Sequence, residues 1–379
     1  MKLENANLLN KRVIIRTDYN VPIIDNKIQS TKRIDASLET IRFVLKQEPK
    51  QLILISHLGR PKNNTECSLE IVREYLEKIL EQSVVLNKTF ELNENDKIVI
   101  LENIRHHEEE TKDIETTQEF REKLTSLCDV YINDAFGCSH RAHSSIVGIN
   151  PPEKYLGFLV EKEVRYLGDI FSSEGVKTLL LGGSKVVDKI ALINNLIPKF
   201  DNVLIGGGMA FTFLKYLGYD IGNSLFDEEG SEKVEDIIKN AKENKTNIFL
   251  PVDAVFSTEF GNNGNIKEEK MQQKGNLEGW MGLDIGFQTT INYNKVLDKS
   301  NIIVWNGPMG VFEMSNFENG SRNIMNFLAS KQGITTIIGG GDTASCCEKF
   351  GLENKMTHVS TGGGASLELL EGKKLPGIF

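Results

Sequence analysis

Short runs of β-branched residues and leucine recur along the chain, separated by stretches in which apolar residues keep helical spacing. The runs cover residues 13–15, 52–55, 98–101 and 130–132 in the first half, and 178–181, 203–205, 248–250, 302–305, 335–338 and 358–360 in the second. Continuous apolar runs of this length, bounded by turn residues, are typical of buried strands in a parallel sheet. The pattern therefore predicts one parallel sheet in each half of the chain.

Helical spacing appears between the first two runs and again between the two halves. Four apolar residues stand at i, i+4, i+7 and i+11: Ile34, Leu38, Ile41 and Leu45. That spacing places them on one face of an amphipathic helix, which predicts a βαβ unit. Apolar positions in 156–171 keep similar spacing just after two prolines, which predicts a helix between the halves.

The length of 379 residues is too great for one ordinary hydrophobic core, so we expect two domains. The predicted fold is α/β, with two Rossmann-like, doubly wound parallel-sheet domains and a cleft between them. We expect the domains to cover residues 1–155 and 172–366, joined by the interdomain helix at 156–171. Two polar stretches, 108–119 and 261–275, are expected to be solvated loops or helix faces without chemistry of their own.

Composition and charge exclude several classes of protein. Apolar residues at 40% and charged residues at 26% are typical of a globular protein, and a net charge of −9 argues against nucleic-acid binding. The five cysteines lack C-x-x-C spacing, so the sequence supports neither a disulfide framework nor a zinc site. With no apolar signal core and no run of membrane-spanning length, we expect a cytoplasmic protein in a reducing compartment without membrane partners.

Three triple glycines, at 206–208, 339–341 and 362–364, stand close behind predicted strands. Random placement of 33 glycines would give about a quarter of one such run. Glycine lets backbone N–H groups approach an anion, and a helix that begins there adds the positive end of its dipole. Packing explains a single pair such as 182–183 equally well, but three triplets indicate a phosphate site, and no P-loop pattern is present.

A weak dinucleotide fingerprint leaves a nicotinamide dehydrogenase open as an alternative. Gly339, Gly341 and Ala344 fit G-x-G-x-x-A after a predicted strand. The acidic residue expected about 20 positions later is missing, because Ser360 and Thr361 stand there. A binding module that has lost catalysis is a third hypothesis.

Basic side chains follow the predicted strands of the first half. They are Arg16, Arg33, His57, Arg60, Arg105, His140, Arg141 and His143. Guanidinium groups suit a phosphate or a carboxylate, although a surface ion pair or a helix cap explains any one of these residues as well. Asp18 and Asn20 in such a cluster would hold a hydroxyl group or orient an arginine.

The motifs in this order resemble those of phosphoglycerate kinases, and the resemblance spans nearly the whole chain. In the first half it rests on RTDYNVP at 16–22, SHLGRP at 56–61, LENIR at 101–105, NDAFG at 133–137 and HRAHS at 140–144. In the second half it rests on residues 181–189, 206–211, 250–253, 280–284, 305–313, 339–343 and 360–365. The family moves a phosphoryl group between 1,3-bisphosphoglycerate and ADP, which gives 3-phosphoglycerate and ATP.

This resemblance implies a role for particular residues in each domain. The first domain would bind phosphoglycerate through Asp18, Asn20, Arg33, His57, Arg60, Arg105 and Arg141. The second would bind ATP or ADP through Lys185, Lys189, Gly208, Gly282, Asn306, Glu313, Gly340, Gly341, Asp342 and Thr343, with Phe211 and Leu283 also at the adenosine. Asp342 would serve Mg²⁺, and Arg33 and Lys185 would meet the transferring phosphoryl group. We also expect N–H groups around Gly363, at the start of a predicted helix, to face that group. The only partners implied are these small molecules, bound by a monomer.

The chain departs from the family pattern at three uncharged or weakly basic positions. Tyr19 and His106 stand where phenylalanine is common, and Phe287 replaces a frequent proline. None of these changes removes a charged ligand. The tail, 367–379, is expected to pack on the first domain.

Phosphoryl transfer requires positioning and charge neutralisation, and a carboxylate nucleophile with a pKa of about 4 needs no general base. His57 and His140 are therefore expected to bind or support substrate, and the domains to close around the reactants.

Overall fold

The computed structural model describes residues 2–61 and 67–379. The chain divides into two compact units, one of Met1–Arg165 with Lys374–Phe379 and one of Tyr166–Lys373. The division falls inside helix α6 (Phe158–Gly168), which follows Pro151 and Pro152 as the apolar spacing predicted.

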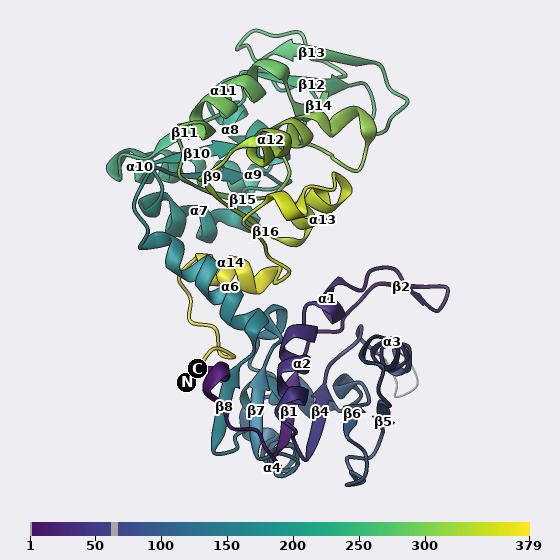
Figure 1. Cartoon of the computed structure of the whole chain (residues 1–379). Helices are drawn as coiled ribbons and strands as arrows, with labels where there is room; N and C mark the ends of the chain where they lie inside the picture. The colour runs from purple at the N-terminus through teal and green to yellow at the C-terminus, as the bar shows by residue number, and fades with distance from the viewer. Residues whose placement is uncertain (1, 62–66) are drawn as a thin grey trace. The chain divides into compact units, whose positions relative to one another are not determined.

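The first unit is built on a six-stranded sheet whose neighbouring strands are all parallel. Its order is β5-β6-β4-β1-β7-β8, as Figure 1 shows. The strands are β1 (Arg12–Arg16), β4 (Gln51–Ile55), β5 (Val85–Asn87), β6 (Ile98–Leu101), β7 (Val130–Asn133) and β8 (Glu153–Leu156). Strands β4 and β6 are buried along their whole length, which explains why they read as unbroken apolar runs.

Helices cover both faces of this sheet, so the unit has two hydrophobic layers. Along β1, Val13 and Ile15 belong to one apolar cluster and Ile14 to the other, as the alternation of a strand requires. The helices are α1 (Lys32–Asp35), α2 (Leu38–Lys46), α3 (Glu70–Leu80), α4 (Gln118–Ser126) and α5 (Ser144–Val147), with a β2 (Ile23–Ile24), β3 (Lys27–Ile28) hairpin. Short 3₁₀ helices cover Leu3–Asn5, Ile104–His106, Glu108–Glu110, Ile114–Thr116 and Phe136–Cys138.

The single helix predicted from Ile34 to Leu45 is wrong in one respect. The structure breaks it between α1 and α2, and Ser37 Oγ donates a hydrogen bond to the carbonyl of Ile34 at 2.7 Å at the break. A serine hydroxyl that bonds the preceding turn competes with the regular helical pattern, which the apolar spacing alone does not reveal.

The second unit repeats the plan with the parallel order β11-β10-β9-β15-β16-β17. Its strands are β9 (Lys177–Leu181), β10 (Asn202–Ile205), β11 (Asn247–Phe249), β15 (Ile302–Asn306), β16 (Thr335–Gly339) and β17 (His358–Val359). Every predicted apolar run therefore overlaps a strand. The predicted fold class, α/β with two parallel-sheet domains, is confirmed.

The helices of the second unit are α7 (Ile190–Leu196), α8 (Gly207–Tyr216), α9 (Glu228–Ser231), α10 (Val234–Glu243), α11 (Phe287–Leu297), α12 (Asn319–Ser330), α13 (Gly341–Lys349) and α14 (Gly364–Leu370). Short 3₁₀ helices cover Asp169–Phe171, Val187–Lys189, Ile197–Lys199, Ser315–Phe317 and Glu353–Lys355. None of the helices that the structure describes is both long and apolar enough to span a lipid bilayer.

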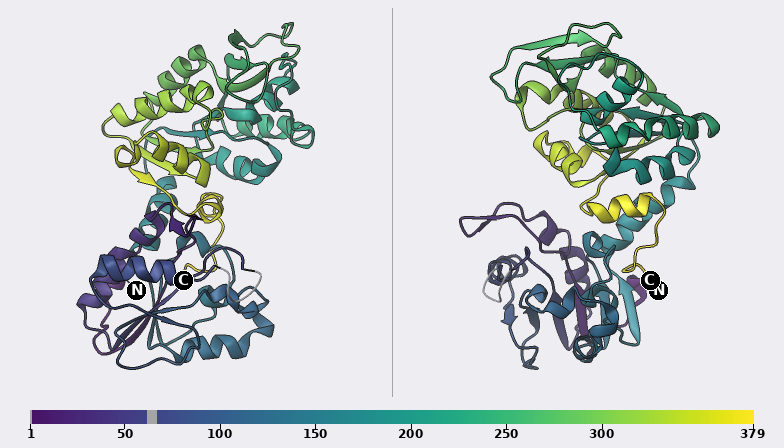
Figure 2. Two further views of the ribbon diagram at one scale, coloured as in Figure 1. Left: turned by 90° about the vertical axis from the view of Figure 1, so that its right-hand side faces the viewer. Right: turned by 180° about the vertical axis from the view of Figure 1, so that it is seen from behind.

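A three-stranded antiparallel sheet in the second unit was not predicted. It consists of β12 (Asp253–Ser257), β13 (Ile266–Lys270) and β14 (Met281–Ile285), in the order β13-β12-β14. Both views of Figure 2 show it, in green, at one end of this unit. Strand β13 lies within the stretch 261–275, so the expectation of a loop or helix face there is wrong. Its side chains are mostly exposed and charged, which hides the strand from a search for apolar runs.

The last residues of the chain, Lys374–Phe379, belong to the first unit. There the Nδ2 group of Asn133 donates to the carbonyl of Gly377 at 2.7 Å, and the N–H of Gly377 donates to the carbonyl of Ser139 at 2.9 Å. These bonds hold the tail against the loop that follows β7.

Tyr293 tests the packing of the second unit. Its buried hydroxyl donates to the carbonyls of Ile205 and Phe249, at 2.5 and 3.2 Å. Tyr293→Phe is expected to lower the free energy of unfolding by about 1–3 kcal/mol, because buried acceptors lose their donor. Denaturant unfolding followed by tryptophan fluorescence measures this change, since Trp280 and Trp305 both lie in this unit.

The matched control is Tyr216→Phe, because the Tyr216 ring is 41% exposed. Its effect is expected to stay within about 0.5 kcal/mol. Equal effects of the two substitutions would contradict a role for the buried hydroxyl.

Candidate active site

In the first unit, the loops that follow β1, β4 and β6 are tied together by polar side chains. Asn20 Oδ1 accepts a hydrogen bond from the N–H of Gly59 at 2.8 Å, and Arg105 donates to the carbonyl of Gly59 at 2.7 Å. Because the strands are parallel, these loops leave the same edge of the sheet. Residues that are far apart in the sequence are therefore held within one cluster.

Asp18 orients an arginine, as its position in the basic cluster suggested. Its carboxylate accepts from Arg33 at 2.5 Å and from the N–H of Asn20 at 3.1 Å. Burial opposes ionisation, but the Arg33 guanidinium and the neighbouring cations outweigh it and lower the pKa of Asp18. The carboxylate is thus ionised at neutral pH and keeps Arg33 in place.

His57 is neutral at neutral pH. Burial lowers its pKa to about 3, and the Arg16 guanidinium, 3.4 Å from His57 Nδ1, acts in the same direction. An uncharged imidazole in this cluster offers a hydrogen bond to a substrate, not a positive charge.

Two residues lie beneath the cluster: Arg16 was placed at a strand end by the sequence analysis without a role of its own, and Glu110 was missed. Arg16 is 1% exposed, and its Nε donates to Ser145 Oγ at 2.7 Å. Glu110 is fully buried, and its carboxylate accepts from the N–H and the hydroxyl of Ser145 at 2.8 and 2.7 Å. The carboxylate also lies 3.8 Å from the Arg16 guanidinium.

Glu110 corrects the expectation that 108–119 has only solvated polar residues. Burial raises the pKa of Glu110, while Arg16 and Ser145 oppose the change. A run of acidic residues gives no sign of which member is buried, so the sequence offered no signal for Glu110. Arg16 did carry one, because it ends an apolar run inside the motif RTDYNVP.

Arg60 and Arg141 lie at the exposed border of the cluster. Arg60 follows Gly59 on the loop after β4, and Arg141 Nε lies 3.3 Å from His140 Nε2. The positive charge of Arg141 is close enough to Arg105 to help lower its pKa, although burial is the larger cause.

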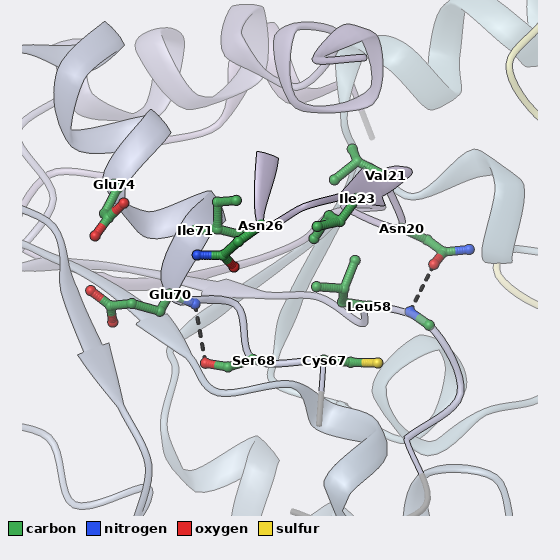
Figure 3. Close-up of a pocket in the computed structure, with 11 residues that line it drawn as sticks. Asn20, Val21, Ile23, Asn26, Leu58, Cys67, Ser68, Glu70, Ile71 and Glu74 are labelled. Atoms are coloured by element: carbon green, nitrogen blue, oxygen red, sulfur yellow. Dashed lines mark hydrogen bonds between the residues drawn. The ribbon is translucent and has the colours of Figure 1, made fainter. Parts of the chain in front are cut away.

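A cavity of about 550 Å³ borders Asn20 and Gly59 on another side (Figure 3). It is lined by apolar side chains such as Val21 and Ile71 together with Glu70 and Glu74. Among its described lining residues there is no arginine, lysine or histidine, so this cavity does not suit a phosphorylated acid.

In the second unit, glycine turns and two lysines line a cavity of about 240 Å³. Its lining includes the predicted phosphate ligands Lys185, Lys189, Asn306, Gly340, Gly341, Asp342 and Thr343. The Lys189 ammonium donates to the carbonyl of Gly182 at 2.6 Å and to Asn306 Oδ1 at 2.7 Å. Burial lowers the pKa of Lys189 to about 8, although the Asp342 carboxylate opposes the change.

A second, more apolar cavity of about 440 Å³ shares Gly183, Ser184 and Asp342 with the first. The predicted residues Gly208, Gly282, Leu283 and Glu313 line it, together with side chains such as Leu225 and Phe260. Gly282 is required there, because a Cβ atom at this position would lie 2.0 Å from the ring of Phe211. An apolar cavity joined to a glycine-lined, lysine-containing one suits a base with its phosphates.

Asp342 is the predicted ligand for a metal ion in this unit. Its carboxylate is exposed, stands at the start of α13 and lines both cavities. Mg²⁺ binds through one or two carboxylates together with substrate phosphates and water, so a single carboxylate here fits Mg²⁺ carried by a nucleotide.

Gly363 does not join these residues. It precedes α14 with φ of 53°, and it lines neither cavity of the second unit. Leu367, one helical turn later, does line the smaller cavity.

Comparison with known proteins identifies the family. The family model for phosphoglycerate kinase matches residues 3–373. A phosphoglycerate kinase of Dictyostelium discoideum is 47% identical over 406 aligned positions, which cover 100% of this chain and 96% of that protein. The chain belongs to the phosphoglycerate kinase family.

Other members give the same result. Phosphoglycerate kinase 1 of Sus scrofa is 44% identical, with 100% of this chain and 97% of that protein covered. The solved structure of phosphoglycerate kinase from Coxiella burnetii superimposes with a TM-score of 0.91 at 35% identity, covering 100% of this chain and 97% of that one. The predicted resemblance and the enzyme class, a phosphotransferase, are confirmed, and the dehydrogenase hypothesis loses its support.

The lowered pKa of Lys189 leads us to predict that nucleotide binding depends on pH. Because its pKa in the free protein is about 8, the ammonium loses its proton as pH rises through that value. The affinity for MgADP should then fall by up to about tenfold per pH unit, since the charged form is the one that binds phosphate. Titration calorimetry between pH 7 and pH 9.5 measures this fall.

The comparison variant is Lys189→Arg, which stays charged throughout this range. Its affinity for MgADP can differ from that of the original protein, but its pH profile should be flat. A flat profile for the unsubstituted protein would contradict the assignment.

Proposed function

We propose that the chain catalyses the reversible transfer of a phosphoryl group between 1,3-bisphosphoglycerate and ADP, giving 3-phosphoglycerate and ATP in glycolysis. The observation that carries this proposal is that the two units contain different candidate binding sites. One unit has a cluster of arginine and histidine at its strand ends, and the other has paired cavities suited to a base and its phosphates.

The first unit is proposed to bind the phosphoglycerate. Arg33, Arg105 and the exposed Arg60 and Arg141 would neutralise its phosphate and carboxylate, because guanidinium groups form paired hydrogen bonds to such anions. Asp18 would act through Arg33, whose guanidinium it holds at 2.5 Å. The remaining proposed ligands are Asn20 and His57.

The second unit is proposed to bind the nucleotide with Mg²⁺. The adenosine would occupy the larger cavity beside Gly208, Gly282 and Glu313, and the phosphates the smaller one. Asp342 borders both cavities, so its carboxylate would hold Mg²⁺ at the phosphates. When bound, Mg²⁺ would neutralise negative charge on the phosphate oxygens.

The reaction is proposed to proceed by direct transfer without a general base. In the direction that consumes ATP, the nucleophile is a carboxylate, which is already ionised at neutral pH. The low pKa of His57, about 3, fits this mechanism, because a neutral imidazole is needed only for binding. Lys185, Arg33 and the N–H groups near Gly363 would neutralise the phosphoryl group in transit.

Domain closure belongs to the same proposal. With acceptor ligands in one unit and nucleotide ligands in the other, transfer requires the units to bring the two substrates together and to exclude water. We further propose that the protein is a monomer and that it is cytoplasmic. The five free cysteines support a reducing compartment.

The test of this function is a coupled assay of 3-phosphoglycerate with MgATP. The expected result is turnover that depends on both substrates and on Mg²⁺. A protein that is folded by circular dichroism but shows no turnover would overturn the proposal.

Lys185→Ala tests the proposed role of the exposed lysine in the phosphate cavity. Loss of one preorganised cation should lower kcat by about 10²- to 10³-fold. The control is Lys215→Ala, since Lys215 is an exposed lysine near the end of α8 and should be neutral. If only KM changes in Lys185→Ala, the lysine binds the ground state and does not assist the transfer.

A further inference from the structure

Three potential metal ligands of different chemistry converge in the first unit. Asp18 follows β1, His57 follows β4 and Cys138 follows β7. One ligand atom from each side chain lies within 4.8 Å of the other two, and Cys138 Sγ is 3.8 Å from His57 Nδ1. The three residues are 39 and 81 positions apart, so no spacing motif reveals them.

These distances are close to those of an assembled metal shell. In a tetrahedral zinc site the Zn–N, Zn–O and Zn–S bonds of about 2.0–2.3 Å put the ligand atoms about 3.3–3.8 Å from one another. The thiol and the imidazole already stand at such a distance. Asp18 is the most exposed of the three, with 11% of its side chain accessible.

We propose that Asp18, His57 and Cys138 form a binding site for a soft divalent metal ion such as Zn²⁺. Three protein ligands leave the fourth tetrahedral position open to water or to an anion. Binding replaces the thiol proton: a Zn–S bond forms, the S–H bond breaks and the proton passes to solvent. No electron is transferred.

The charge around the site determines which complex forms. The Cys138 thiolate and the Asp18 carboxylate together neutralise Zn²⁺. Arg16, Arg33 and Arg105 surround the thiol and oppose the rise in its pKa, which burial takes to about 12 in the free protein. These cations therefore favour an anionic fourth ligand, such as hydroxide or chloride, on the bound metal.

The soft sulfur and nitrogen ligands of this site give it a different metal preference from the Mg²⁺ site proposed at Asp342. Thiolate and imidazole select Zn²⁺ and similar ions, whereas Mg²⁺ prefers oxygen ligands and retains its water. Excess Mg²⁺ is accordingly expected to leave the site free for Zn²⁺.

Metal binding here would inhibit the enzyme. The metal uses the Asp18 carboxylate, which otherwise holds Arg33 at 2.5 Å, and it uses the imidazole of His57. It should therefore compete with 3-phosphoglycerate. The competition rests on the proposed function, whereas the metal site itself does not.

Cobalt binding tests the site without an activity measurement. Co²⁺ replaces Zn²⁺ in tetrahedral sites, and bonding to a thiolate adds a sulfur-to-metal charge-transfer band in the near ultraviolet. Titration of the full chain, free of nucleotide, should show this band with one Co²⁺ per chain, and Zn²⁺ should abolish it. Addition of 3-phosphoglycerate should weaken Co²⁺ binding.

Cys138→Ser should remove the charge-transfer band and weaken binding about 100-fold or more, since losing even an outer-shell partner costs about 10- to 100-fold. The matched control is Cys128→Ser, because Cys128 is also buried and bonds only weakly, to the carbonyl of Thr125 at 3.7 Å. It should bind like the original protein. Cys138→Ala serves as the second variant if the serine protein does not fold.

Activity then shows whether the bound metal inhibits. With Mg²⁺ in excess and free Zn²⁺ buffered, Zn²⁺ should raise KM for 3-phosphoglycerate, a chelator should reverse the effect, and Cys138→Ser should escape it. Absence of the cobalt band, or a band that survives Cys138→Ser, would overturn the site. Cobalt binding in a protein without kinase turnover would instead overturn only the proposed function.

Discussion

Parallel strand pairing is the constraint on which both candidate sites depend. In each six-stranded sheet every neighbouring pair is parallel, so all strands end at the same edge. Loops that follow strands distant in sequence are thereby brought together. In the first unit this places Asp18, His57 and Arg105 in one cluster, and in the second it places Lys189 beside Asn306. An antiparallel sheet of the same strands would send alternate loops to opposite edges.

The second unit shows how glycine turns the strand ends into a cavity. Gly207 adopts φ of 64°, and a Cβ atom there would lie 2.6 Å from the backbone N of Gly183. The two glycine turns therefore approach each other more closely than any other residue would allow. Helix α8 begins at this point, where the N–H of Gly207 donates to the carbonyl of Met309 and the N–H of Met209 to the carbonyl of Gly183, both at 2.9 Å. Glycine thus allows close backbone packing beside the apolar cavity, which Gly183, Gly207 and Gly208 line.

The sequence predicted the strands well because burial on both faces leaves an unbroken apolar run, as in β4. Some candidate ligands, such as Asp18 and His57, follow those runs closely, whereas the full set of candidate ligands comes from the family resemblance. The sequence missed β13, whose charged side chains are exposed while its backbone pairs with β12. It also missed Glu110, since burial of one acid among several depends on tertiary contacts with Arg16 and Ser145. The sequence did not predict a strand or a buried side chain that is polar, because the position of each depends on contacts with residues far away in the sequence.

The buried polar layer beneath the first cluster contributes to the protonation state of His57. Arg16 and Glu110 are both removed from solvent, and each would be costly to bury without the other and without Ser145 between them. Burial is the main cause that lowers the pKa of His57, and the fixed cation at this depth adds to it by disfavouring protonation of the imidazole. The same cation favours any anion that approaches the imidazole. A site for an anionic substrate needs a positive electrostatic potential. An arginine that is always charged supplies this potential beneath the strand ends, while the buried histidine stays neutral.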